Sequence, residues 1–159
     1  MTTSFDPATE SELKTLSCTN LRLRQLVRRV GQHYDAEMAK VGLKTTQYSL
    51  LSHTLQLGPV RPGELAAAMQ FTPSTLTRNL KPLVDAGWVT LAAGSDARSR
   101  SVLITDAGRA KRLEAQPHWK AAQQQLNQLL GAERVLALHG LINESLMLLD
   151  AANLPDPMD

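Results

Sequence analysis

The feature that most restricts the fold is a short segment with clear signals for the start and the end of a helix, followed by two brief apolar segments. Thr72-Pro73 is a typical helix start, because the hydroxyl can cap free backbone N–H groups and proline fits the first helical position. Gly87 is a typical helix end. Residues 88–91 and 101–105 are apolar or β-branched, and a turn-rich link joins them. This order predicts a helix followed by a β-hairpin.

The rest of the chain carries mainly helical signals. Apolar side chains at spacings of three and four predict a long first helix over residues 11–40. Shorter helices are predicted over 45–57 and 62–69, a long one from Thr105 to about residue 130, and a last one over 132–151. Pro117 predicts a kink in the long fifth helix. The chain is therefore expected to be mainly α, with one small hairpin.

Composition narrows the class of protein. Cys18 is the single cysteine, so no disulfide can form within the chain, as is usual in a reducing compartment. The first ten residues lack the apolar core of a signal peptide, and no apolar run reaches the roughly 20 residues that cross a membrane. We therefore expect a cytoplasmic protein.

Charge is unevenly distributed along the chain. Residues 61–112 carry eight basic and four acidic side chains, whereas the remainder carries nine basic and eleven acidic ones. The positive excess thus lies in the segment that contains the helix pair and the hairpin. Such clustering is typical of proteins that bind a polyanion, although a solvated basic face would look the same.

Helices over 62–69 and 73–86 followed by a hairpin form the pattern of a winged helix-turn-helix. Leu76 and Leu80 are predicted to face the core in the second of these helices. Polar side chains on the other side are free to contact a DNA groove, and these are Thr72, Ser74, Thr75, Thr77, Arg78 and Lys81. Hydroxyls near a helix start suit phosphate, and an arginine one turn further can bind guanine. The alternative is a threonine-rich amphipathic helix in a bundle.

The order and spacing of several motifs resemble the MarR (multiple antibiotic resistance regulator) family over residues 15–150. The motifs are Gly42-Leu-Lys-Thr-Thr-Gln-Tyr48, Glu64-Leu-Ala66, Ser74-Thr-Leu-Thr-Arg78, Asp85-Ala-Gly-Trp-Val89, Asp96-Ala-Arg98-Ser-Arg100 and Leu103-Ile-Thr-Asp-Ala-Gly108. The resemblance implies a homodimer with interlocking N- and C-terminal helices, a recognition helix for the major groove and a wing for the minor groove. It makes Arg98 the wing-tip residue, with Asp96 holding the wing arginines, Arg100 among them.

This resemblance implies a division of the chain and a function. Residues 1–44 and 107–159 would form a helical dimerisation region, and residues 45–106 a winged DNA-binding lobe. The expected function is a ligand-responsive transcriptional regulator, a repressor that a small aromatic acid releases from a pseudo-palindromic operator. Effector pockets in this family lie where the first, second and fifth helices meet the lobe. The candidate effector-binding residues are Arg24, Arg28, Tyr48, Ser52, His53 and Trp119. The arginines could instead be solvated or pair between subunits.

Two other functions are compatible with the sequence. A redox-sensing regulator based on Cys18 and an architectural DNA-binding protein without effector are the alternatives, although we expect Cys18 to be a buried structural residue. The spacing of the four histidines does not suggest a metal site, and we expect neither a metal nor a cofactor. The sequence offers no set of nucleophile, base and orienting group, so an enzyme is not expected.

Two positions depart from the family pattern. Lys44 stands where a capping threonine is usual, so Thr45 is expected to cap the second helix instead. Pro82 lies inside the predicted recognition helix and removes a backbone donor, which predicts a bend or early fraying without loss of DNA binding.

Overall fold

The structure is a computed structural model that describes residues 9, 11–12, 16, 18–93 and 100–152. It confirms a mainly helical chain with one two-stranded antiparallel hairpin, β1 and β2. In chain order the elements are α2 (Thr19–Met38), the 3-10 turn η1 (Ala39–Val41), α3 (Thr45–Leu57), α4 (Pro62–Met69), α5 (Pro73–Asp85), β1 (Val89–Ala93), β2 (Arg100–Ile104), α6 (Asp106–Leu130) and α7 (Ala132–Ala151).

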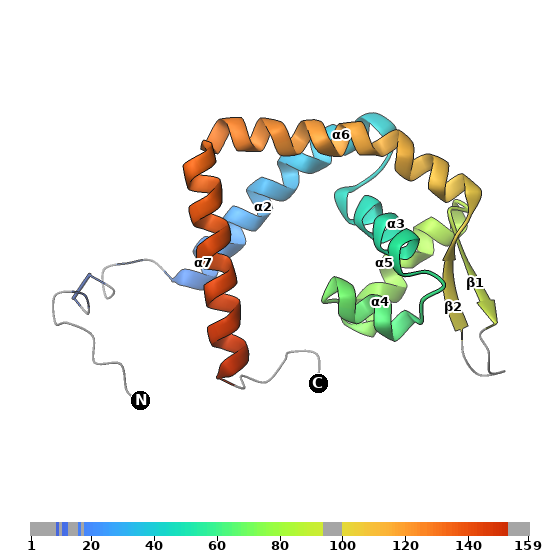
Figure 1. Cartoon of the computed structure of the whole chain (residues 1–159), viewed down its shortest axis with the longest axis horizontal. Helices are drawn as coiled ribbons and strands as arrows, with labels where there is room; N and C mark the ends of the chain where they lie inside the picture. Colours follow the sequence, from blue (N-terminus) through green and yellow to red (C-terminus); the bar gives the residue numbers. More distant parts are fainter. Residues whose placement is uncertain (1–8, 10, 13–15, 17, 94–99, 153–159) are drawn as a thin grey trace.

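The elements form a lobe and a helical arm, as Figure 1 shows. Helices α3, α4 and α5 gather beside the hairpin to make the lobe. Helices α2 and α7 lie at the other end, and α6 runs from the hairpin to α7 along the top of the view. Helix α6 also packs against both α2 and α3. The same helix therefore reaches from the lobe into the arm.

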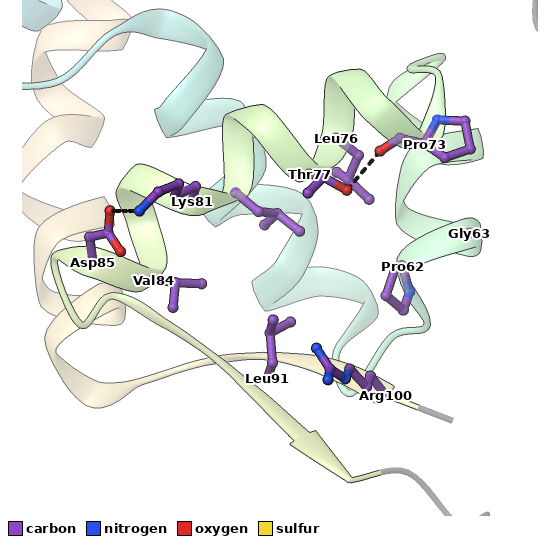
Figure 2. Close-up of a pocket in the computed structure, with 11 residues that line it drawn as sticks. Pro62, Gly63, Pro73, Leu76, Thr77, Lys81, Val84, Asp85, Leu91 and Arg100 are labelled. Atoms are coloured by element: carbon purple, nitrogen blue, oxygen red, sulfur yellow. Dashed lines mark hydrogen bonds and ion pairs between the residues drawn. The ribbon is translucent and has the colours of Figure 1, made fainter. Parts of the chain in front are cut away.

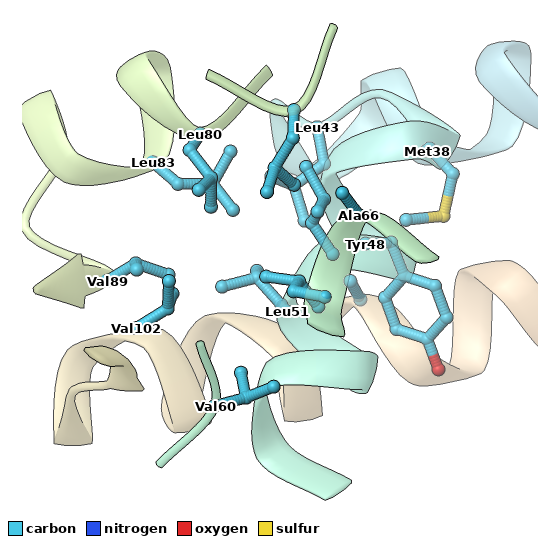
Figure 3. Packing of buried hydrophobic residues seen from close by; sticks show 14 residues of the cluster. Met38, Leu43, Tyr48, Leu51, Val60, Ala66, Leu80, Leu83, Val89 and Val102 are labelled. Carbon is cyan, nitrogen blue, oxygen red and sulfur yellow. The ribbon is translucent and has the colours of Figure 1, made fainter. Parts of the chain in front are cut away.

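The core lies in the lobe, where α3, α4, α5 and the hairpin meet (Figure 3). Leu51 of α3, Leu83 of α5 and Val102 of β2 are all fully buried. Burying a side chain of this size contributes roughly 1.5–3 kcal/mol to folding. The apolar faces of these short helices thus fix their positions, and with them the orientation of α5.

The hairpin is held to the helical lobe by backbone pairing. Val89 lies opposite Ile104 and Ala93 opposite Arg100 in its antiparallel register. Val60, in the loop between α3 and α4, forms an isolated bridge with Val102, with N···O distances of 2.8 and 3.2 Å. A third segment therefore anchors the base of the hairpin, and the sequence pattern did not reveal it.

Local signals at helix ends are confirmed. The Thr72 hydroxyl accepts a hydrogen bond from the Thr75 N–H at 3.1 Å, and the Thr105 hydroxyl accepts one from the Gly108 N–H at 3.0 Å. Gly87 has φ 73° just after α5, and Gly131 has φ 83° between α6 and α7. These left-handed conformations favour glycine, which explains why each helix ends there.

Two expectations about helix starts are wrong. Helix α2 begins at Thr19 rather than near residue 11, because Leu16 and Cys18 are not helical. The segment 15–19 is rich in Ser, Thr and Cys, which are poor helix formers. Thr45 does not cap α3: its N–H and hydroxyl both donate to Asp35 Oδ1 of α2, at 2.8 and 2.7 Å. A carboxylate from another helix therefore does the capping.

Pro82 does not fray α5, which continues to Asp85. The helix does not depend on the backbone N–H that Pro82 lacks, because other contacts hold the residues around it in place. Ala86 N–H donates to Pro82 O at 3.0 Å, and Leu80 and Leu83 on either side are buried. Helix α6 likewise continues through Pro117.

The arm is less buried than the lobe. No residue of α7 is buried, and Leu136, Leu141 and Met147 are each more than 60% exposed. Cys18 is exposed as well, contrary to the expectation of a buried cysteine, because it precedes the first turn of α2. The described part of the chain contains no helix long and apolar enough to span a membrane. Nor do its His, Cys, Asp and Glu residues include a group of three that could hold a metal ion.

Candidate nucleic-acid interface

Helix α5 has one buried face and one exposed face. Leu76, Leu80 and Leu83 are buried against the core. Besides Pro73 and Pro82, the exposed residues of the helix carry hydroxyl or charged side chains at spacings of three and four residues, and they are Ser74, Thr77, Arg78, Lys81 and Asp85. This spacing puts them on one side of the helix. We call these five residues the outer face of α5.

The six residues predicted from the sequence on this helix have different roles. Thr72 and Thr75 are half-buried and bond to each other, since the Thr72 hydroxyl donates to Thr75 Oγ1 at 2.8 Å. They therefore shape the start of α5 rather than project from it. Thr77 is exposed, although its hydroxyl donates to Pro73 O at 2.9 Å. Arg78 is exposed, and no side chain in residues 18–93 or 100–152 pairs with it.

Asp85 also belongs to the outer face, although it is not among the residues predicted from the sequence to contact DNA. Its Oδ2 lies 2.7 Å from Lys81 Nζ, one helical turn earlier (Figure 2). Both side chains are more than half exposed. The i, i+4 spacing in the sequence could have revealed this pair. The pair means that Lys81 is already partly neutralised before any anion approaches.

A groove of about 400 Å³ separates α5 from the hairpin. Leu76, Leu80 and Leu91 contribute to its apolar lining, and Leu91 extends from β1 towards α5 in Figure 2. Lys81 and the exposed Arg100 also line it. Helix α5 and the hairpin therefore place basic side chains on both sides of one groove. Asp96 and Arg98, predicted for the wing, lie outside the described residues.

A second cluster joins α3 to α6. The rings of Tyr48 and Trp119 stack with centroids 6.0 Å apart and planes 25° apart. The Arg112 guanidinium lies 5.8 Å from the centre of the Tyr48 ring, and its Nε donates to Ser52 Oγ at 3.1 Å. Tyr48, Ser52 and Trp119, three of the predicted effector residues, are thus brought together. We call them, with Arg112, the aromatic cluster.

Arg112 could have been found from helix spacing. It lies seven residues before Trp119, on the same side of α6, and Tyr48 and Ser52 are likewise four residues apart on α3. A cation near the face of an aromatic ring is favourable by roughly 0.5–2 kcal/mol. What the sequence could not supply was the pairing of these two helices.

The other predicted effector residues lie apart from the aromatic cluster. On α2, the residue next to Trp119 is Tyr34, with ring centroids 6.5 Å apart. Arg24 lies ten residues earlier, about 15 Å along the helix axis, and both Arg24 and Arg28 are exposed. The His53 ring bonds instead to Ser49 O within α3, at 2.8 Å. In the part of the chain that the structure describes, none of these three residues bonds to a side chain of the cluster.

A larger groove of about 500 Å³ lies between α2, α6 and α7. Its lining is mainly apolar, with Val27, Val30 and Leu126 from the first two of these helices and Leu138 and Ile142 from α7. The apolar residues predicted on α2 and α7 therefore border an open groove instead of being covered within the chain.

Comparisons with known proteins identify the family. The model of the MarR family matches residues 41–99. An uncharacterized HTH-type transcriptional regulator, YwoH of Bacillus subtilis (strain 168), is 27% identical over 84 residues. That match covers 53% of this chain and 61% of YwoH, so the chain spans about three-fifths of the length of this curated relative.

Solved structures extend the similarity to most of the chain. The M. tuberculosis transcriptional regulator MosR in complex with DNA is 32% identical, with a TM-score of 0.67 over 81% of this chain and 98% of that one. A mutant MarR from E. coli complexed with operator DNA shares the fold, with 22% identity and a TM-score of 0.74 over 80% of this chain and 92% of that one. Regulators of this family are generally non-enzymatic. The chain belongs to the MarR family of DNA-binding transcriptional regulators.

Proposed function

We propose that the chain is a homodimeric repressor that binds a pseudo-palindromic operator and releases it when a small aromatic acid binds. The observation that carries the DNA-binding part is the outer face of α5, which is exposed opposite a fully packed face. In this proposal residues 45–106 form the DNA-binding lobe, and residues 1–44 and 107–159 form the dimerisation region.

We assign the DNA contacts by chemistry. Arg78 is free to bind the edge of a guanine through two hydrogen bonds in the major groove. Ser74, Thr77 and Lys81 suit phosphates beside it, while Thr72 and Thr75 orient the start of the helix. Arg100 and Arg98 of the wing suit the minor groove, whose negative potential attracts arginine when it is narrow, and Asp96 would hold these arginines in place.

The proposed dimer rests on the open groove between α2, α6 and α7. Its apolar lining and the exposed leucines of α7 are costly to leave in water, and a second copy of the chain carries the same surface. Two recognition helices related by a dyad would contact half-sites roughly 10 base pairs apart.

The proposed effector site is the aromatic cluster. An aromatic acid could stack near Tyr48 and Trp119 and bond its carboxylate to Arg112, whose Nε already bonds to Ser52. Because the cluster joins α3 of the lobe to α6, a ligand there can favour a spacing of the recognition helices that DNA does not fit. A preference of about 100-fold, roughly 2.7 kcal/mol, would empty most operators.

The DNA-binding proposal is tested by selecting bound sequences from random duplex DNA and measuring the size of the complex. We expect an enriched pseudo-palindrome with half-sites about 10 base pairs apart, bound by two chains. Sedimentation that shows a stable monomer at micromolar concentration would contradict the dimer. Enrichment of no sequence at all would favour an architectural DNA-binding protein.

The effector is tested by thermal shift and by release of the selected operator, with benzoates, hydroxycinnamates, nicotinates and indole acids. Arg112→Ala should weaken the response, whereas Arg109→Ala, an exposed arginine on the same helix, should leave it unchanged. If Arg24→Ala or Arg28→Ala weakens the ligand response instead, the effector site includes these two arginines, as the sequence predicts. If only peroxide releases the operator and Cys18→Ser prevents this, the protein is a redox sensor.

A further inference from the structure

The turn between α5 and β1 is bonded tightly to the end of the recognition helix. The Trp88 N–H donates to Leu83 O at 2.9 Å, and the Gly87 N–H donates to Val84 O at 2.9 Å. These bonds close the C-terminus of α5 and lead directly into the first strand of the wing. The turn at Gly87 and Trp88 therefore moves with the recognition helix.

Thr105, between β2 and α6, joins this turn to the start of α6. Its backbone N–H donates to Trp88 O at 3.0 Å, and its hydroxyl donates to Gly87 O at 2.7 Å. The same hydroxyl accepts the Gly108 N–H at 3.0 Å, so it also caps α6. One side chain thus links the end of the recognition helix, the base of the wing and the start of α6.

Gly108 allows α6 to approach this turn directly. It is buried, and a Cβ atom at this position would lie 2.0 Å from Trp88 O and 2.9 Å from Ile104 Cγ1. Any larger residue would push the helix away from the turn. The joint is therefore a contact of backbone on backbone, without a flexible side chain between the two elements.

The far end of α6 lies in the arm, so the angle of this joint matters. Helix α6 has 25 residues and is about 37 Å long. A change of about 5° at the joint would displace the far end by about 3 Å, close to one base-pair step of DNA. In the proposed dimer, the arm sets the distance between the two recognition helices through this lever.

We propose that Thr105 and Gly108 are positioning residues for DNA recognition, because they hold the recognition helix, the base of the wing and α6 in one rigid unit. The inference rests on the proposed function as a dimeric operator-binding protein. Because the unit is rigid, the protein should bind well only to operators with the correct spacing between half-sites. A loosened joint would leave contact with each half-site intact while tolerating a wrong spacing.

The test compares operators whose half-sites have the native spacing, one base pair more and one base pair less. The wild-type protein should lose on the order of tenfold in affinity for each altered operator, because one half-site falls out of register. Thr105→Val, which cannot form the two hydroxyl bonds, should reduce the ratio of affinities for the native and altered operators to about threefold or less. Its affinity for non-specific DNA should be unchanged. Thr105→Ser, which retains the hydroxyl, should restore the wild-type ratio.

The matched control is Ala67→Gly, an exposed position on α4 outside both the joint and α6. It should retain the wild-type ratio of affinities for the native and altered operators at a similar loss of thermal stability. If Thr105→Val discriminates spacing as the wild type does, or if Ala67→Gly relaxes it equally, the positioning role is wrong.

Hydrogen exchange on the unmodified protein keeps the inference testable if Thr105→Val does not fold. The amides of Trp88, Thr105 and Gly108 should exchange as slowly as those of the buried part of α5, as members of one cooperative unit. Fast exchange at these three amides would overturn the rigid joint. Because this measurement needs no DNA, it also separates failure of the joint from failure of the proposed DNA binding.

Discussion

Asp85 places a negative charge on a face whose other members are hydroxyl-bearing or basic. An exposed ion pair such as the one it forms with Lys81 contributes only about 0–1 kcal/mol to stability. In the proposed complex with DNA, the carboxylate would compete with phosphate for Lys81. Asp85 would thereby limit non-specific binding.

Asp85→Asn should therefore tighten binding to non-specific DNA. Freeing Lys81 adds about one phosphate contact, so the slope of log K against log salt should become steeper by about 0.9. A salt titration of fluorescence anisotropy measures this. Glu114→Gln is the matched control, because it frees Lys111 from an ion pair on α6 in which only the glutamate is more than half exposed. Equal slopes for all three proteins would show that Lys81 does not contact phosphate.

Single residues were predictable where the signal is local. Thr72 and Thr105 cap helices as expected, because the cap and its partner lie within three residues. Asp35 and Arg112 were missed, because their partners lie 10 and 60 residues away in the chain. Such contacts depend on how helices pack, which no local pattern encodes.

Among the elements, α2 and α6 are joined by a polar contact at Glu37. Its Oε1 accepts hydrogen bonds from Lys40 at 2.7 Å and from Gln125 of α6 at 3.2 Å. The hydrogen bond from Lys40, followed by that from Gln125, lowers the pKa of Glu37 below its usual value. Glu37 therefore stabilises the folded state when it is ionised.

This contact predicts a specific pH dependence. A lowered pKa in the folded state gives stability that is complete above the unfolded value of about 4.5 and is lost as the pH falls through the folded value. Glu37→Gln should thus lower the melting temperature at pH 6, and its difference from the wild type should shrink towards pH 3. A difference that stays constant across this range would show that the ionised carboxylate contributes nothing.

Elements were predictable almost to the residue where glycine, proline or a cap marks their ends. The bounds of α3, α4 and α7 are those expected, and α5 and α6 differ by about one residue. Helix α2 was extended too far, because apolar spacing continues beyond its start. The bridge at Val60 was missed, because a single paired residue leaves no pattern in the sequence.

At the scale of the whole molecule, the lobe is well packed, whereas the arm exposes apolar surface. The exposed leucines of α7 account for much of this apolar surface. The sequence could not predict that Arg112 lies beside Tyr48, because that contact depends on how α3 and α6 pack in three dimensions.

The central claim is that the outer face of α5 reads the operator, and Arg78 tests it most directly. Fluorescence anisotropy at matched salt should compare the wild type with Arg78→Ala on the selected operator and on unrelated DNA. Arg134→Ala on α7 is the control for loss of one exposed arginine. We predict that Arg78→Ala loses about 1–3 kcal/mol, roughly 5- to 150-fold, on the operator and much less on unrelated DNA. Equal affinities of wild type and Arg78→Ala for the operator would contradict the account.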